Sequence, residues 1–163
     1  MINPLDPRTI LLARHAQHIV LIHFPIALFV SGVALDLLSR GKIVSRFAAA
    51  AYINLTIAAL TVVPAAATGL LAWQFALGGR RLKGLLLLHF AGGLFSTVLI
   101  LASWWVQRRS RKATRELLPG YRLVIEFLGV VVLGLTAHLG GFLSGVNAAR
   151  TVAQVQTDRQ LLI

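Results

Sequence analysis

The hydrophobic positions of this chain gather into four long blocks that contain few or no charged residues. The blocks cover residues 18–38, 47–73, 84–106 and 121–143, and short basic segments separate them. A helix that crosses the hydrocarbon core of a bilayer needs about 20 mainly apolar residues, and every block meets that requirement. The pattern predicts an all-α integral membrane protein whose four transmembrane helices form an up-down bundle.

The remaining segments are short and are expected to belong to the same single membrane domain, residues 1–163. Residues 7–17 are modestly amphipathic and are predicted to lie at the membrane interface. Residues 147–163 form a polar tail that is expected to leave the membrane. The first block is too long for a cleaved signal peptide and has no small-residue cleavage site. No internal repeat is evident in the sequence.

Composition agrees with this class, because 57% of the residues are hydrophobic and only 13% are charged, whereas soluble domains contain about 25% charged residues. The net charge is +11, which in a soluble protein would indicate nucleic-acid binding. Here the Lys and Arg residues cluster at the ends of the apolar blocks, where they contact anionic lipid headgroups and direct topology. The lipid bilayer is therefore the expected partner, and nucleic-acid binding is not expected.

The distribution of Lys and Arg also orients the chain. Four spans place both termini on one side of the membrane, together with the second connection. The first and third connections hold nine basic residues, counting Arg122, against seven in the termini and the second connection. The positive-inside rule therefore predicts that both termini lie on the outer side of the membrane. Trp73, Trp104 and Trp105 lie near block ends, the depth of the interfacial aromatic belts.

The candidate chemistry is restricted to ionisable residues within the spans. The chain has no cysteine, which excludes disulfides and thiolate metal sites. It contains no phosphate-binding loop, nucleophile elbow or metalloprotease helix, so no catalysis of its own is expected. Ionisable groups inside a membrane are costly and mark candidate functional sites. Those in this chain are His18, His23, Asp36, His89, Glu126 and His138.

Three of the histidines are predicted to lie at one depth. His23 and His89 each follow the start of a span by about five residues, and His138 precedes the end of the fourth span by about as many. Because these three helix ends meet at one membrane face, a rise of about 1.5 Å per residue places the imidazoles roughly 7–8 Å below it. His18 is shallower and lies at the interface itself.

Small residues accompany the three deeper histidines at helical spacing. They are Ala27, Ser31 and Ala34 for His23; Gly92, Gly93 and Ser96 for His89; and Gly134, Gly141 and Gly145 for His138. Such faces leave room for a haem b, which needs axial imidazoles and close helix approach. Its candidate ligands are His23, His89, His138 and, as the least central one, His18. Small residues are equally the usual contacts of packed membrane helices, and copper or zinc could use His23, His89 and His138 instead.

The acidic residues lie towards the opposite membrane face. Asp36 precedes Arg40 by four residues, and Arg122 precedes Glu126 by four. This spacing predicts two ion pairs, each within a single helix. A contact to a proton or to a quinone headgroup is the alternative role for these carboxylates.

The string His-Ile-Val-Leu-Ile-His-Phe-Pro-Ile-Ala-Leu at residues 18–28 resembles the first-helix signature of a bacterial four-span family, domain of unknown function 2231. Further matches bring the resemblance to about residues 15–147; they are Asp36, Thr68-Gly69-Leu70, His89 and His138-Leu139-Gly140-Gly141. The chain departs from the family pattern at Ile19, Ala72-Trp73 and Phe142-Leu143. Some members are joined to Rieske-type iron–sulfur domains, so the resemblance implies a redox setting.

The leading hypothesis is a b-type haem-binding membrane subunit that exchanges electrons with a redox partner protein or within a larger membrane complex. Spans one and three are diagonal in an up-down bundle, which suits His23 and His89 as ligands, with His138 as the alternative partner of either. A non-redox structural or assembly subunit is the second hypothesis. A transporter or a copper- or zinc-binding protein ranks last, because the predicted histidine layer reaches only one leaflet.

Overall fold

The computed structural model describes residues 14–39, 45–112 and 120–146, and its long helices coincide with the apolar blocks. The helices are α2 (Arg14–Ser39), α3 (Ser45–Leu71), α4 (Gly84–Lys112) and α5 (Tyr121–Leu143). A short π-helical segment, η1 (Ala72–Ala76), prolongs α3. Each long helix contains a segment that is long and apolar enough to cross a membrane, which confirms the predicted all-α membrane bundle. The polar tail and residues 7–13 lie outside the described residues, and residues 14–17 open α2.

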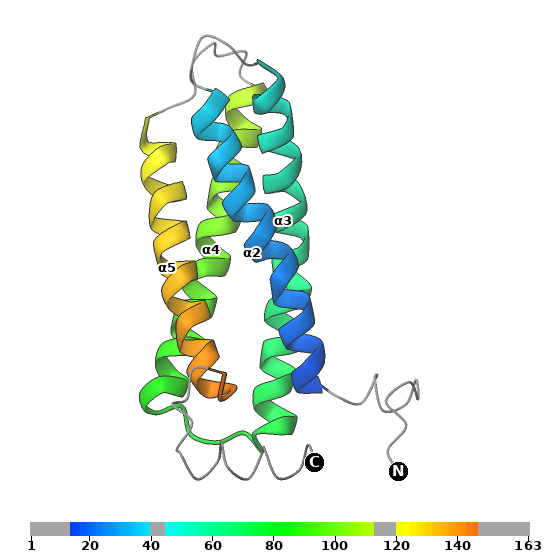
Figure 1. The fold of residues 1–163 in the computed structure, drawn as a ribbon, viewed down its shortest axis with the longest axis vertical. Coiled ribbons are helices and arrows are strands. Elements are labelled where there is room, and N and C mark those ends of the chain that lie inside the picture. Colours follow the sequence, from blue (N-terminus) through cyan, green and yellow to red (C-terminus); the bar gives the residue numbers. More distant parts are fainter. Residues whose placement is uncertain (1–13, 40–44, 113–119, 147–163) are drawn as a thin grey trace, which may run out of the picture.

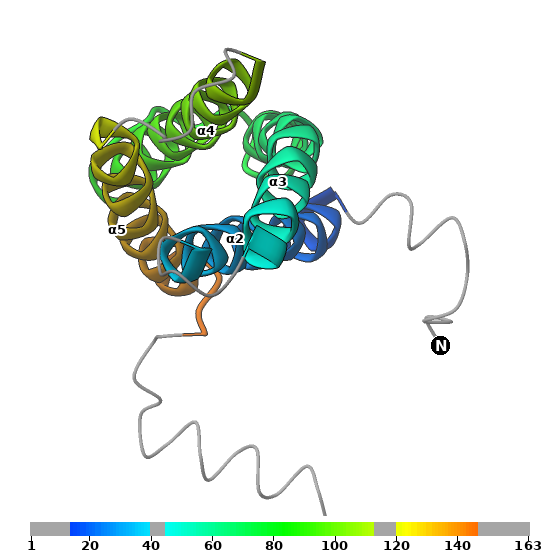
Figure 2. The same ribbon diagram turned by 90° about the horizontal axis from the view of Figure 1, so that it is seen from above.

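The four long helices stand side by side and alternate in direction (Figure 1). α2 and α4 begin at the end of the bundle where α3 and α5 finish. Viewed along the bundle, the helices form a ring in the order α2, α3, α4, α5, so that α2 and α4 are diagonal (Figure 2). The end that contains the starts of α2 and α4 is called the histidine end below, and the opposite end is called the arginine end.

Packing is closest between α2 and α3, where small residues let the backbones approach. A Cβ placed on Gly32 would lie 3.0 Å from Leu55 Cγ, so α2 uses this glycine to reach α3. Asn54 Nδ2 also donates a hydrogen bond of 3.0 Å to Ser31 Oγ across the same interface. The buried core in the middle of the bundle consists of Phe29, Val33, Leu55, Ala58, Ala59, Val62, Ile100 and Leu133.

The second hairpin, α4–α5, repeats the first hairpin, α2–α3, with an offset of 71 residues, since His18 corresponds to His89 and Gly69 to Gly140. Burial follows the same offset along both hairpins. Corresponding buried pairs are Phe29 and Ile100, Asp36 and Gln107, Ala51 and Arg122, Leu55 and Glu126, Ala58 and Gly129, and Val62 and Leu133. Few of the paired residues are identical, so sequence identity does not reveal the repeat. It is visible instead in burial and contacts. The expectation of no internal repeat is therefore corrected.

The repeat gives the bundle an approximate twofold axis along its length. Corresponding helices run in the same direction (Figure 1), as in membrane proteins built from parallel repeats. Residues separated by the offset therefore lie at equal depth in the two hairpins. Differences between corresponding residues then show where one hairpin has acquired a feature that the other lacks.

Candidate functional site

His18 joins the two helices of the first hairpin. Its Nδ1 lies 3.1 Å from the Ala65 carbonyl oxygen and 3.3 Å from Thr68 Oγ1, both on α3. The edge of the ring rests on Gly69, where a Cβ would come within 2.9 Å of His18 Cε1. A larger residue at position 69 would displace the imidazole, so the glycine is required for this contact.

His89 joins the second hairpin in the same way. Its Nδ1 lies 3.0 Å from the Thr136 carbonyl oxygen on α5, and its ring rests on Gly140, where a Cβ would approach Cε1 to 3.0 Å. In both hairpins the accepting carbonyl lies 47 residues after the histidine, and the glycine follows that carbonyl by four residues. We call these two repeat-related arrangements the histidine clasps.

The hydrogen bonds of the histidine clasps determine which ring nitrogen carries the proton. A carbonyl oxygen only accepts hydrogen bonds, so the Nδ1 atoms of His18 and His89 are the donors. The lone pair of each neutral imidazole is then on Nε2, one of the two nitrogens through which histidine binds metals. Metal-binding histidines usually donate their other ring N–H to a carbonyl or carboxylate group. Both clasps supply such a partner.

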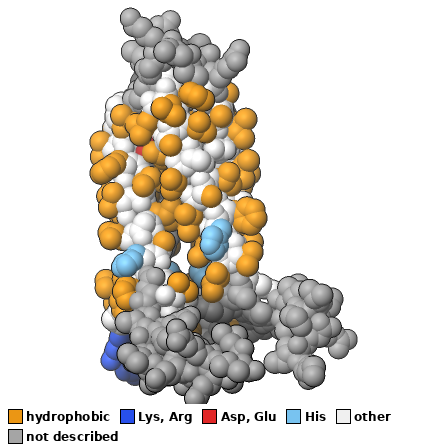
Figure 3. All heavy atoms as spheres, in the orientation of Figure 1, with side chains coloured by type: hydrophobic (Ala, Val, Ile, Leu, Met, Phe, Trp, Pro, Cys, Tyr) orange, Lys and Arg blue, Asp and Glu red, His pale blue; other side chains and the backbone are white. Residues whose placement is uncertain are grey.

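His23 and His138 lie on the outer surface of the bundle, where both side chains are exposed. The Nδ1 of His23 donates to the carbonyl oxygen of Ile19 in its own helix at 2.6 Å. The His138 ring packs edge-on against Phe142, with 5.0 Å between the ring centroids. In Figure 3 the histidine side chains on the visible face lie near one level, towards the histidine end.

The predicted layer of His23, His89 and His138 is not gathered into one ligand set. Among the described residues, no group of three or more His, Cys, Asp or Glu side chains is placed to hold a metal ion. The small-residue face around His138 does not line the interior, because Gly134 is exposed and has no neighbour within 4 Å of a Cβ placed there. Sequence reasoning ranked His18 last and missed its equivalence to His89. The signal was the shared spacing from histidine to glycine in both hairpins.

The two glycines that follow His89 on α4 have different surroundings. The Thr136 side chain of α5 occupies the position next to Gly92. A Cβ placed on Gly93 meets no atom within 4 Å, so neither the His89 ring nor another described side chain lies against this glycine.

An ionic cluster of Asp36, Arg122 and Glu126 lies towards the arginine end, and all three side chains are 0% exposed. Arg122 pairs with Asp36 across the α2–α5 interface. Its Nε also lies 3.2 Å from Glu126 Oε1 in its own helix, which confirms that predicted pair. Arg40, the predicted partner of Asp36, lies outside the described residues. Because the cluster is buried, almost no red Asp or Glu atoms are visible on the face shown in Figure 3.

The buried face of α4 carries further polar side chains. Gln107, the counterpart of Asp36, is 1% exposed, and Ser103 is 0% exposed. Within the described part of the chain, Gln107 Oε1 and Ser103 Oγ have no hydrogen-bond partner, and buried groups of this kind are normally satisfied by water. Leu99 and Ile100 are buried on the histidine side of Ser103. Ser96, which is 3% exposed, continues the buried polar face beyond them towards His89.

Comparison with known proteins identifies a family but no characterised relative. A family described as predicted membrane protein, DUF2231, matches residues 14–153. No curated protein and no solved structure matches the chain. The matched range contains all four helices, both histidine clasps and the ionic cluster.

Proposed function

The chain belongs to the DUF2231 family of predicted membrane proteins, and from this premise we propose that it is a b-type haem-binding subunit in membrane electron transfer. The supporting observation is the pair of histidine clasps, in which His18 and His89 make equivalent hydrogen bonds on diagonal helices. We assign His18 and His89 as the axial ligands. Haem b would supply the one-electron chemistry, and the protein would supply its ligands and an apolar setting.

The donor chemistry of the two clasps fits an iron porphyrin. Each Nδ1–H is held by a backbone carbonyl, which fixes the ring orientation and places the proton on the nitrogen opposite Nε2, the atom that would bind the iron. Gly69 and Gly140 let each ring lie against the neighbouring helix. Since His18 and His89 are related by the repeat axis, they lie on opposite sides of it. Bis-histidine ligation requires this relation between two ligands.

His23 and His138 suit this role less well. Both side chains are exposed on the outer surface, and His23 bonds within its own helix. A ligand pair that included either residue would have to lie outside the bundle. Copper or zinc is also less well supported, because zinc sites usually need four tight ligands.

The absorption spectrum of the protein, produced in haem-replete cells and purified in mild detergent, tests the proposal. We expect a Soret band, a sharp α band on reduction and stoichiometric haem by the pyridine haemochrome assay. A folded, monodisperse protein that shows no Soret band, even after incubation with added haemin, would contradict the haem assignment.

A structural or assembly subunit of a larger membrane complex is the second candidate function. It is favoured by the outward positions of His23 and His138, because polar side chains that face lipid are costly and are normally covered by protein. This function predicts a colourless protein that purifies with a partner. Replacing an outward histidine by an apolar residue, as in His23→Leu or His138→Leu, would then abolish co-purification of the partner. His18→Leu would not.

For the cellular setting, the proposal includes a bacterial inner membrane with periplasmic termini. The two connections at the arginine end carry the excess of Lys and Arg, and positive connections remain cytoplasmic. Alkaline phosphatase fused to the C-terminus is active only if that terminus is periplasmic. Green fluorescent protein fused there is fluorescent only if the terminus is cytoplasmic. An active phosphatase fusion supports this orientation, and a fluorescent C-terminal fusion would reverse it.

A further inference from the structure

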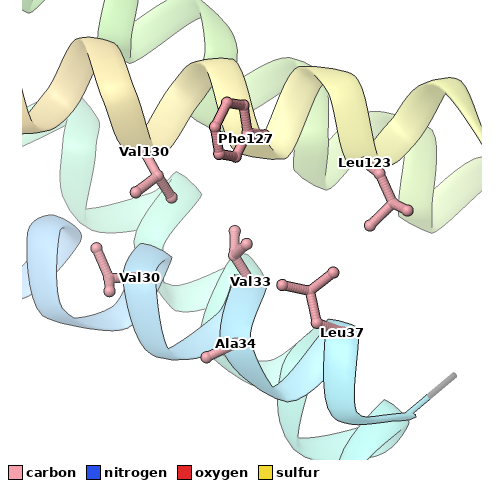
Figure 4. A pocket seen from close by; sticks show the side chains of 7 residues that line it. All are labelled: Val30, Val33, Ala34, Leu37, Leu123, Phe127 and Val130. Atoms are coloured by element: carbon pink, nitrogen blue, oxygen red, sulfur yellow. The ribbon is translucent and has the colours of Figure 1, made fainter. Parts of the chain in front are cut away.

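An apolar groove of about 380 Å³ lies between α2 and α5, on the arginine side of the bundle centre. Its walls are Val30, Val33, Ala34 and Leu37 of α2 and Leu123, Phe127 and Val130 of α5. Val130 and Leu123 of α5 point towards Val33 and Leu37 of α2 across the gap (Figure 4). The groove opens sideways, because Phe127 is 72% exposed and Leu37 is 53% exposed. A molecule dissolved in the bilayer could therefore enter it without crossing the interface.

The repeat explains why the groove exists at this interface and not at its counterpart. The repeat relates the α2–α5 interface to the α4–α3 interface. α2 and α5 pack against each other much less extensively than α4 and α3 do. Val33 in the groove corresponds to Trp104, whose indole packs against the buried core. The counterpart interface is thus closed by a large ring where the groove has only an isopropyl group.

A second contact closes the counterpart interface near the arginine end. Leu123, at that end of the groove, corresponds to Tyr52 of α3. The guanidinium of Arg111 lies 4.5 Å from the Tyr52 ring centroid and bridges α4 to α3. Two aromatic side chains therefore occupy the closed interface at the positions where the groove has Val33 and Leu123.

From this comparison we infer that the groove between α2 and α5 binds a lipid-soluble molecule with a flat, uncharged ring on a hydrocarbon tail, the chemistry of an isoprenoid quinone. The ring would take the place that the Trp104 indole fills in the other interface. Phe127 offers an aromatic face for stacking, and the valines offer an apolar wall for the tail. The volume also falls within the range of small-molecule pockets, roughly 300–1,000 Å³.

The lining of the groove suits an uncharged ligand. Among the described residues, no charged side chain lines it. The ionic cluster of Asp36, Arg122 and Glu126 lies on the same two helices and is buried. This inference does not depend on haem binding, because the groove and the histidine clasps share no residue.

The repeat supplies the substitution that tests the inference. Val33→Trp copies Trp104 into the groove and is expected to fill it. The matched control is Leu60→Trp, which adds an indole to a lipid-facing position of α3 that is 66% exposed. The probe is a menaquinone with a short isoprenoid tail, added to delipidated protein in detergent and measured by equilibrium dialysis.

We expect Val33→Trp to weaken quinone binding by about tenfold or more, since it removes the ring site, and Leu60→Trp to leave binding within about twofold. Equal binding by wild type and Val33→Trp would overturn the inference. Should Val33→Trp not fold, Phe127→Ala replaces it, because this exposed side chain has a small part in packing; the expected loss is then several-fold.

Competition separates the quinone from other occupants. Phosphatidylglycerol at equal concentration should leave the bound quinone in place, and displacement by it would assign the groove to a phospholipid chain. Dimerisation of the wild type that Val33→Trp abolishes would assign the groove to a second copy of the chain. Either result would overturn the proposed ligand.

Discussion

The two hairpins of this bundle share a scaffold but differ in the residues that it carries. Both have a histidine that donates to a carbonyl of the next helix and rests on a glycine. Both bury an apolar side chain at the same central position, Phe29 in one and Ile100 in the other. The clasps join the two helices of each hairpin, and the central side chains belong to the core that both hairpins share. The clasp is thus the feature that the two halves of the chain keep in common despite few identical residues.

The differences lie at the arginine end. Asp36 corresponds to Gln107 in the other hairpin. Arg122 corresponds to Ala51 of α3, and Glu126 corresponds to Leu55. Only one of the two equivalent interfaces therefore contains the ionic cluster, and this is the same interface that contains the groove. We conclude that the histidine end is the symmetric part of the molecule and the arginine end is the specialised part. The substitutions below test that division.

Removal of Arg122 should have the largest effect on stability. Arg122→Ala leaves the carboxylates of Asp36 and Glu126 buried without their guanidinium partner, and loss of one member of a buried ion pair costs about 3–5 kcal/mol. We expect a marked drop in thermal stability in detergent, followed by circular dichroism. Arg108→Ala, at an exposed position over the Trp104 ring, is the control and should change little.

The repeat provides the rescue for this substitution. A triple variant takes the residues of the other hairpin: Asp36→Gln, Arg122→Ala and Glu126→Leu. Because no buried charge remains unpaired, it should recover much of the stability lost by Arg122→Ala alone. A triple variant as unstable as the single one would show that the two interfaces are not equivalent.

Alanine at the two clasp glycines should have an intermediate effect, equal in both hairpins. Gly69→Ala and Gly140→Ala each place a Cβ about 3 Å from an imidazole carbon, and such overpacking costs about 1–3 kcal/mol. The controls Gly93→Ala and Gly134→Ala meet no neighbour and should stabilise their helices by roughly 0.5–1 kcal/mol. Thermal unfolding curves of the four variants compare the hairpins directly. A cost confined to one hairpin would refute the equivalence of the clasps.

The smallest expected effect concerns the closed interface. Arg111→Ala removes the cation–π contact to Tyr52 that joins α4 to α3, a contact of about 0.5–1 kcal/mol at an exposed site. Arg109→Ala removes a similar contact to Trp105 within α4 itself and should lower the unfolding temperature less. The reverse order would mean that Arg111 does not help to close this interface.

The fold was predictable from the sequence because the bilayer imposes it. Apolar blocks of spanning length, with basic connections, leave only an α-helical bundle as a solution, and the predicted spans agree with α2 to α5 within a few residues at most ends. The Arg122–Glu126 pair was also predictable, since it depends only on helical spacing.

The pairing of residues across helices was not predictable. Helical phase shows which residues share a face but not which face turns inward, so exposed His23 and His138 were ranked above His18. Asp36 was assigned a partner in its own helix, whereas its described partner is Arg122 on α5. The repeat was hidden because burial is preserved while residue identities differ, as with Asp36 and Gln107. The shared spacing from histidine to glycine was its trace in the sequence, and the contacts and burial in three dimensions identify the other equivalent positions.

Electron paramagnetic resonance of the oxidised protein, with its four single histidine-to-alanine variants, tests the central claim most directly. If the two hairpins provide equivalent ligands, the wild type will show a low-spin signal of bis-histidine haem. His18→Ala and His89→Ala will each convert it to high spin, and His23→Ala and His138→Ala will leave it low-spin. Loss of the low-spin signal in His23→Ala or His138→Ala, with the signal unchanged in His18→Ala, would contradict the account.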